Sequence, residues 1–412
     1  MRVAGDGLRI IAARATRSFG YGFLAVVLGV YLRLRGYDGT QIGLVFGLML
    51  VGGAVFTILA RALEFRIGRR IQLLLFGGLM VVAGGLLWSS SSLTVIAVAA
   101  VLGVVSPTGT EVGPFLPLEQ GALPQTAPPE DRNAAFAVFN LAGSLAAAAG
   151  ALLGGLPSLL AGPATVRAAD ILPLFLMYAA LGVVVLVLYS GLSPAIEATR
   201  PPGSWPLSPR SRTIVSKLAA LFAVDSFAGG FVLQSFVSYW FFTRWSTPPD
   251  QLALLFSAAN VLTSLSFLAA AAIANRIGLI RTMVFTHIPS NVLLMLVPLM
   301  PSASLGVLCY LGRMALSQMD VPTRQAYTVS VVAPRERVAA AGYTNVARNV
   351  AQSVSPPLAG WSFQFLSLAS PFLIGGGLKI AYDLAIFREF RNVAPIAEPP
   401  TAAGYSGPGG DT

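Results

Sequence analysis

The sequence has very few of the residues on which soluble enzymes depend. Only 11% of the 412 residues are charged, with one cysteine, Cys309, and one histidine, His287, whereas a soluble domain carries roughly 25% charged residues. One cysteine excludes an internal disulfide, and one cysteine with one histidine cannot form an ordinary structural zinc site. No Gly-x-x-x-x-Gly-Lys-Ser/Thr loop is present to bind ATP phosphates. We therefore expect no catalytic residues, no metal and no cofactor, and predict that the protein is not an enzyme.

Apolar residues are abundant instead. They make up 55% of the chain, and the mean hydropathy is +0.73. Because a helix of about 20 apolar residues crosses a bilayer, the sequence predicts an all-α integral membrane protein with twelve transmembrane helices. The predicted spans are residues 18–34, 41–60, 71–90, 93–117, 134–160, 171–192, 214–242, 251–274, 282–300, 302–322, 339–365 and 369–387.

Lysine and arginine are distributed unevenly between the connections. A net charge of +10 would suit nucleic acid binding in a soluble protein, but the arginines here gather between apolar runs, so no nucleic acid partner is expected. If both termini lie on one side, the other side receives only Arg33, Arg35, Arg167 and Arg244. Positive residues favour the cytoplasmic side. We therefore predict a multi-pass protein of the cell (inner or plasma) membrane with both termini cytoplasmic.

Parts of the first half of the chain recur in the second half. An arginine-rich turn at residues 65–70 returns at 275–281, and we call these the two arginine turns. Residues 17–23 resemble 225–231, and 129–132 resemble 334–337. Matches in parallel order predict two like-oriented halves with a path between them. The predicted parts are an N-terminal six-helix bundle (1–192), a proline-rich cytoplasmic linker (193–213), a C-terminal six-helix bundle (214–390) and a disordered cytoplasmic tail (391–412).

The arginine turns resemble a signature of the major facilitator superfamily, Gly-x-x-x-Asp-Arg-x-Gly-Arg-Arg/Lys between spans two and three. The residues that match are Arg66, Gly68, Arg69 and Arg70, with Arg276, Gly278 and Arg281 in a second copy. The acidic position holds Phe65, with Glu64 one residue earlier. The resemblance implies that these residues govern conformational change, and that Glu64 replaces an acid that helps to latch the halves in one state.

The resemblance covers nearly the whole chain. It implies two parallel six-helix bundles and secondary active transport of a small solute by alternating access. Residues 106–125 and 320–327 also look like those of poorly characterised prokaryotic permeases of the superfamily. Arg313 looks like the partner of an arginine that the family carries in span four, and residues 150–155 approximate a glycine-rich stretch that is common among antiporters.

Charged residues inside the apolar spans, together with one asparagine, are the candidates for binding substrate or protons. Such a residue costs about 2.5–3.5 kcal/mol at mid-bilayer on insertion scales, so it usually faces a partner or a wet cavity. Asp225 either binds a proton or substrate or simply pairs with Arg17, and Glu111 either lines a cavity or pairs with Arg14 or Arg17. Prolines and glycines around Glu111 are expected to break the fourth helix. The full set of candidates is Asp225, Glu111, Arg313, Arg17, Arg348 and Asn345.

Other charged residues are read as gating or structural. Glu119 and Arg324 fall opposite each other across the repeat and are expected at the cytoplasmic end as gate or interface residues. Asp320 and Arg324 are spaced i,i+4 and are expected to neutralise each other. Lys379 and Asp383 have the same spacing and are read as a structural pair, and His287 as a packing residue rather than a proton carrier.

The function hypotheses follow from these features. We favour proton-coupled transport by a monomer. Efflux is favoured over uptake, because the glycine-rich fifth span and a largely apolar lining of the path suit antiport of amphipathic compounds. The alternative is uptake of a small organic or anionic metabolite held by Arg17, Arg313 and Arg348. A third hypothesis is a non-transporting receptor or enzyme on the same fold. The expected partners are a small-molecule substrate, protons and the lipid bilayer.

Overall fold

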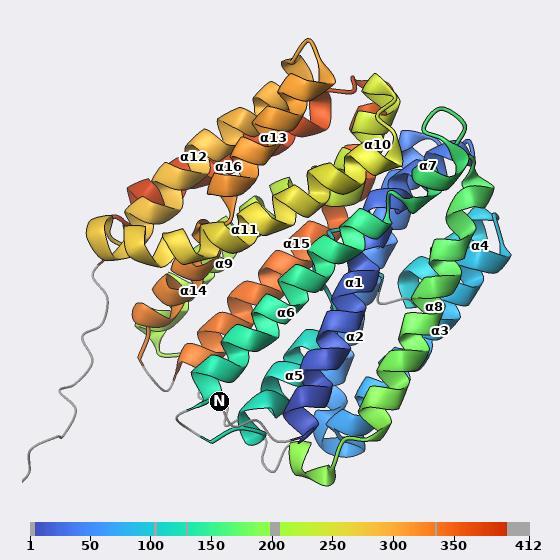
Figure 1. The fold of residues 1–412 in the computed structure, drawn as a ribbon. Coiled ribbons are helices and arrows are strands. Elements are labelled where there is room, and N and C mark those ends of the chain that lie inside the picture. The colour runs from blue at the N-terminus through green and yellow to red at the C-terminus, as the bar shows by residue number, and fades with distance from the viewer. Residues whose placement is uncertain (1–4, 103–104, 129–130, 198–206, 334–335, 394–412) are drawn as a thin grey trace, which may run out of the picture.

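The structure is a computed structural model that describes residues 5–102, 105–128, 131–197, 207–333 and 336–393. Twelve transmembrane spans form two six-helix bundles, drawn in blue to green and in yellow to red in Figure 1. Within the described ranges, nine helical stretches are by themselves long and apolar enough to cross a membrane. The helices of the other three spans, the fourth, tenth and eleventh, are shorter or less apolar. The predicted tail falls outside the described residues from residue 394 on, as do residues 198–206 of the predicted linker.

The first bundle contains spans one to six. Its helices are α1 (Gly5–Leu34), α2 (Gly39–Ile67), α3 (Arg69–Ser89), α4 (Leu93–Leu102) with α5 (Phe115–Ala122), α6 (Arg132–Leu153) with α7 (Leu156–Ala161), and α8 (Ala168–Ser190). Capping determines where several of these helices begin and end. The Asp38 side chain accepts from the Gln41 N–H to start α2, and Gly68 ends it with φ of 77°, a region that favours glycine.

The second bundle repeats this order. Its helices are α9 (Pro209–Gly230) with α10 (Gln234–Trp245), α11 (Pro249–Ile277), α12 (Leu279–Leu296), α13 (Ala303–Ser317) with α14 (Asp320–Ser330), α15 (Arg337–Phe365) and α16 (Ser370–Phe390). Because α9 starts at Pro209, the prediction that the linker extends to residue 213 is wrong at that end. Proline is favoured in the first turn of a helix, where its missing N–H has no partner to lose.

Three spans are interrupted near their middle. The fourth is non-helical over residues 105–114, as its prolines and glycines predict. The seventh was predicted to be continuous, but it breaks between Gly230 and Gln234, after the Gly229-Gly230 pair, which favours helix poorly. The tenth breaks at residues 318–319. Interrupted helices leave backbone groups free, and such groups are tolerated in a membrane where they line a cavity.

The first arginine turn is held by two carboxylates, Glu64 on α2 and Glu197 in the segment after α8. Arg69 Nε donates to Glu64 Oε1 at 2.6 Å, while the backbone N–H groups of Arg69 and Arg70 donate to the Glu197 carboxylate at 2.5 and 3.1 Å. The Glu197 carboxylate therefore satisfies N–H groups at the start of α3, where the helix dipole favours an anion. Glu64 is therefore paired with Arg69, within the first bundle.

The two bundles pack tightly at the end opposite the arginine turns, which we call the far end. Ser235 Oγ of α10 donates to the Ala25 carbonyl of α1 at 3.2 Å. Helices α2 and α15 approach so closely that a Cβ on Gly360 would lie 2.1 Å from the Gly39 carbonyl oxygen. Small residues allow such backbone contact between membrane helices. These contacts close the far end.

Burial along the same helices falls off toward the arginine turns. In α2 the buried residues lie between Gly39 and Gly53, except for Ala60. In α15, Thr344 is the one buried residue among positions 341–352, and Asn345 and Asn349 are exposed there. Polar side chains are costly against lipid, so this face of α15 is suited to water.

Candidate functional site

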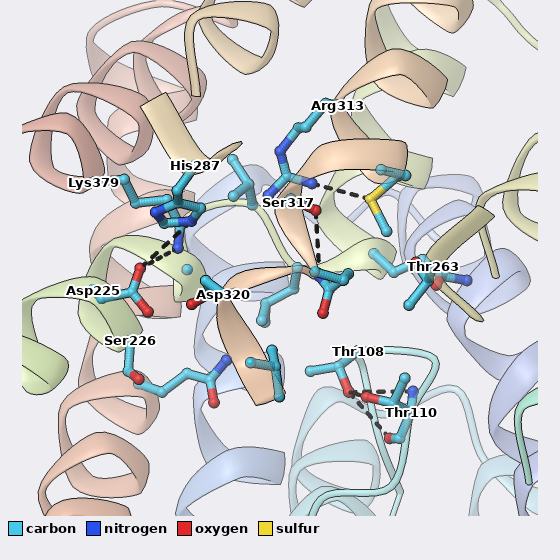
Figure 2. Close-up of a pocket in the computed structure, with 18 of the residues that line it drawn as sticks. Thr108, Thr110, Asp225, Ser226, Thr263, His287, Arg313, Ser317, Asp320 and Lys379 are labelled. Carbon is cyan, nitrogen blue, oxygen red and sulfur yellow. Dashed lines mark hydrogen bonds and ion pairs between the residues drawn. The ribbon is translucent and has the colours of Figure 1, made fainter. Parts of the chain in front are cut away.

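A cavity of about 320 Å³ lies between the bundles (Figure 2). Volumes of roughly 300–1,000 Å³ are typical of small-molecule sites. The lining is predominantly polar, and all of its ionisable side chains come from the second bundle. The lining residues are Thr108, Thr110, Val112, Asp225, Ser226, Gly229, Val232, Leu233, Gln234, Asn260, Thr263, His287, Tyr310, Arg313, Met314, Ser317, Gln318, Asp320, Val321, Arg324, Arg348, Gln352 and Lys379.

The cavity sits at the level where the helices break. Residues 108–112 belong to the non-helical segment of span four, Leu233 and Gln234 flank the break in span seven, and Gln318 lies in the break of span ten. Arg348 and Gln352 fall near the middle of the continuous helix α15. The site therefore lies about halfway along the spans, at the depth of a bilayer midplane.

Asp225 is the centre of a buried ion cluster. Its carboxylate accepts from Lys379 Nζ at 2.6 Å and from Arg324 Nη1 at 3.1 Å, and its side chain is 5% exposed. The prediction that Asp225 pairs with Arg17 is therefore wrong. The actual partners lie on α16 and α14, within the same bundle, and the three side chains all line the cavity.

His287 connects this cluster to a second carboxylate. Its Nδ1 lies 2.8 Å from Asp383 Oδ1, and its Nε2 lies 4.0 Å from Asp225 Oδ1; Asn291 donates to the other oxygen of Asp383 at 3.2 Å. Lys379 and Asp383 were expected to pair with each other, but each binds a different partner. His287 is buried, as a packing residue would be, and it also lines the cavity.

Arg324 and Asp320 form the predicted i,i+4 pair, with Arg324 Nη1 2.7 Å from Asp320 Oδ2. Both residues line the cavity rather than the arginine-turn end. The expected position of Arg324 at the end of the bundle is thus wrong, because α14 begins at the level of the break. Arg324 also reaches Asp225, so one guanidinium joins two carboxylates.

Arg313 and Arg348 line the cavity without a carboxylate within 4.0 Å among the described residues. Arg313 is 8% exposed, and its Nη1 contacts the Met314 sulfur at 3.2 Å. Arg348 Nε donates to Ser226 Oγ at 2.9 Å. Both were candidates for holding a substrate, and the structure brings them into one cavity.

A separate ion cluster lies inside the first bundle. Arg17 pairs with Glu119 at 2.6 Å and with Glu111 at 2.8 Å, and Arg14 also contacts Glu111. Arg17 and Glu119 are fully buried, and Tyr189 donates to Glu119 at 2.8 Å. Two guanidinium groups balance two carboxylates here, as one of the two readings of Glu111 predicted.

The members of this first-bundle cluster do not line the cavity. Arg17 and Glu111 are therefore not brought together with Asp225 and Arg313, although all four were proposed for one site. Glu119 was expected at the cytoplasmic end, but it is held inside the bundle by Arg17. Asn345 is exposed on α15 and also lies outside the cavity lining, as do the residues of the arginine turns.

Several lining residues went unnoticed in the sequence. Asn260 and Thr263 of α11 and Ser317 of α13 are uncharged, so a search for intramembrane charges passes over them. A weaker signal was present, because Asn260, Thr263 and Ser264 interrupt the apolar run in the middle of span eight. Figure 2 shows Thr263 across the cavity from Asp225.

Two six-helix bundles around a polar cavity at mid-membrane depth define a membrane protein built as a solute transporter. The sequence pattern of the Major Facilitator Superfamily matches residues 10–319. The chain belongs to this superfamily. The fold and the membrane character predicted from the sequence are thereby confirmed.

Individual relatives add detail about the fold. The "Uncharacterized membrane protein YJR124C" of Saccharomyces cerevisiae is 26% identical, over 92% of each chain. The nucleoside transporter NupG superposes with a TM-score of 0.73 at 14% identity, covering 93% of this chain and 98% of NupG. A D-xylose-proton symporter gives a TM-score of 0.72 at 14% identity, covering 93% and 97%. At such identities the solved structures establish the fold alone.

Proposed function

We propose that the protein moves a small polar solute through the central cavity by alternating access, and that the movement is coupled to protons at Asp225. The observation that carries this proposal is the position of the cavity. It lies at mid-membrane depth between two bundles, and the bundles are clamped at the far end. A site exposed to one side at a time is the requirement for alternating access.

The polar lining favours a small polar substrate over an amphipathic one. Hydrophobic and aromatic side chains predominate in typical drug-sized pockets, but here charged, amide and hydroxyl side chains predominate. Of the two directions considered, the lining supports uptake of a small organic metabolite more than efflux of amphipathic compounds. The arginine content of the connections supports cytoplasmic termini in the cell membrane, and we propose that a monomer suffices because the cavity is built within one chain.

Asp225 is the proposed proton site because it faces the cavity and has movable partners. Arg324 belongs to α14, beyond the break in span ten, and Lys379 belongs to α16. A carboxylate that loses its cationic partners in a dry environment favours the protonated form. Displacement of α14 relative to α9 would therefore release the Arg324 contact and allow Asp225 to take a proton. Glu111 is less suited, because it lies outside the cavity between Arg14 and Arg17.

Proteoliposomes provide the test. Purified protein is reconstituted and assayed with a panel of labelled metabolites, first by exchange at equal pH and then with an imposed pH gradient. Asp225→Asn is expected to retain exchange but to lose accumulation driven by the gradient, because the neutral amide cannot carry a proton. Glu389→Gln, at an exposed surface pair with Lys217, is the control. Binding without exchange would instead support a receptor, and accumulation by Asp225→Asn equal to wild type would refute coupling at this residue.

A further inference from the structure

We propose that the cavity binds a small organic dianion, held by Arg313 and Arg348. This inference rests on the proposed transport function and adds the substrate class. The two guanidinium groups come from different helices, α13 and α15, and both line the same cavity. Planar guanidinium groups form paired hydrogen bonds with carboxylate and phosphate oxygens.

The charge balance of the lining leaves two positive charges without counter-ions. Two carboxylates, Asp225 and Asp320, face four permanent cations. Arg324 contacts both carboxylates and Lys379 contacts Asp225, so the carboxylates are already shared by these two cations. Arg313 and Arg348 remain. Uncompensated charge is costly in a membrane interior, and a ligand with two negative charges removes this cost.

Of the two arginines, Arg313 provides the stronger evidence for an anion site. Its side chain is more than nine-tenths buried, its Nε has no hydrogen-bond partner, and its Nη1 donates to the weakly accepting sulfur of Met314. The guanidinium also lies over the Tyr310 ring at 5.9 Å, and no carboxylate pairs with it among the described residues. Buried guanidinium groups are ordinarily paired. In Figure 2 the Arg313 side chain points toward the same cavity as His287 and Ser317.

Uncharged lining residues also offer buried donors to the cavity. Gln234 Nε2 and Asn260 Nδ2 are buried without a hydrogen-bond partner in the described structure, and both side chains line the cavity. Together with Arg313 Nε they form a set of N–H groups that lacks acceptors. A neutral polyol supplies donors and acceptors alike, whereas carboxylate and phosphate groups supply acceptors. The unmet demand therefore favours an anion.

The size of the cavity suits a compact ligand. About 320 Å³ is at the lower end of the range for small-molecule sites. A short dicarboxylate or a small phosphomonoester fits this volume. The shared chemistry is a compact molecule with two negative charges, and the experiment separates the carboxylate from the phosphate source.

The test compares three molecules of nearly equal size that differ in charge, namely succinate, succinamate and succinamide, with methyl phosphate as the phosphate probe. Binding to the purified full chain is measured by calorimetry. Succinate or methyl phosphate should bind, and each amide that replaces a carboxylate should weaken binding. Arg313→Gln and Arg348→Gln should each weaken dianion binding about 30-fold or more, as expected when a buried charge loses its partner. Arg313→Lys should retain part of the affinity.

Controls separate this inference from misfolding and from the transport proposal. Arg212→Gln removes an exposed arginine at the start of α9 and should leave binding unchanged. Thermal unfolding of each variant shows whether it is folded. If Arg313→Gln is unfolded, the affinity of Arg313→Lys for the dianion tests the role of the positive charge instead. Succinamide binding as tightly as succinate, or no binding of either dianion at millimolar concentration, would overturn the inference. If the protein exchanges neutral solutes but binds no dianion, the dianion inference fails and the transport proposal stands. If it binds a dianion but exchanges nothing, the transport proposal fails and the dianion inference stands.

Discussion

Arg17 and Glu119 form a doubly hydrogen-bonded ion pair that is completely shielded from solvent. Arg17 Nη2 lies 2.6 Å from Glu119 Oε2, and Nη1 lies 3.0 Å from Oε1. The Arg17 guanidinium also stacks over the Phe115 ring at 4.1 Å. The pair joins α1 to α5, the short helix that follows the break in span four, and so anchors α5 within the first bundle.

The first prediction concerns this pair. Glu119→Gln is expected to destabilise the protein by about 3–5 kcal/mol, because it leaves part of a buried positive charge without compensation. The measurement is thermal or denaturant unfolding in detergent. Glu389→Gln, which removes one member of a half-exposed pair with Lys217, should change stability by about 0–1 kcal/mol. Equal effects of the two substitutions would show that the buried pair contributes no more than a surface pair.

The second prediction concerns the far end. Gly360→Ala places a Cβ 2.1 Å from the Gly39 carbonyl oxygen, a distance that backbone atoms cannot accommodate without moving apart. The substitution should therefore separate α2 from α15 and favour states open at the far end. Spin labels at Arg35→Cys and Ser367→Cys, in a Cys309→Ser background, should report longer distances.

Gly78→Ala serves as the control for this experiment, because nothing lies within 4 Å of a Cβ at Gly78. It should leave the spin-label distances unchanged and slightly favour the helix, by about 0.5–1 kcal/mol. An unaltered distance distribution in Gly360→Ala would mean that the close approach of α2 and α15 does not hold the far end shut.

The third prediction compares the equivalent glycines of the two arginine turns, Gly68 and Gly278. Gly68 and Gly278 end α2 and α11 with φ values of 77° and 88° and ψ of 160°, so alanine at either position should cost about 1–3 kcal/mol in backbone strain. Gly68→Ala should cost more than Gly278→Ala, because its Cβ also lies 2.8 Å from the Glu197 carboxylate, whereas nothing lies within 4 Å at Gly278. Unfolding of both variants measures the difference, and a larger loss for Gly278→Ala would contradict this account.

The fourth prediction is a pH dependence at Glu336, in the connection before α15. Its carboxylate accepts from the Ser211 hydroxyl and the Ser208 N–H, each at 2.6 Å, and these hydrogen bonds lower the pKa of Glu336 to about 2. A carboxyl whose pKa falls on folding stabilises the folded state above its unfolded pKa of about 4.3. That contribution is lost as the pH falls toward about 2.

Glu336→Gln tests this dependence. At neutral pH the variant should be less stable than wild type by about 1.5–3 kcal/mol, the contribution of hydrogen bonds to a charged group. The difference should shrink as the pH is lowered from about 5 toward 2, because wild-type Glu336 then becomes neutral as well. Melting temperatures of the two proteins across this range provide the measurement. A constant difference at every pH would exclude the carboxylate charge as its source.

The fold was largely predictable because a bilayer imposes simple constraints. A run of apolar residues long enough to cross can only be a helix, and the parallel repeats indicated two like-oriented bundles. The break in span four was also readable from Pro107, Gly109, Gly113 and Pro114. Helix ends were less predictable. Helix α9 begins before its apolar run, at the capping residue Ser208, and α11 continues beyond its apolar run to the capping residue Gly278.

The site was only partly predictable. Isolated charges in apolar runs identified Asp225, Arg313 and Arg348, because the cost of burial makes such residues rare. Their partners were not predictable. Arg324 and Lys379 lie 99 and 154 positions from Asp225, and no local spacing rule connects residues so distant. The symmetry of the repeat was misleading here, because it suggested Arg17 as the partner of Asp225, whereas the cationic partners of Asp225 lie in its own bundle.

The breaks in spans seven and ten have a mechanical consequence. Each break is a joint between two rigid rods, and Asp225 and Arg324 lie on the arginine-turn rods α9 and α14. Their ion pair joins these two rods, while α10 is attached to α1 through Ser235. Arg313 lies on the opposite rod of span ten and Arg348 on the uninterrupted α15. A molecule held by both arginines, as proposed above, would therefore restrain rotation at the joint, and occupancy of the cavity would then change the stiffness of the protein.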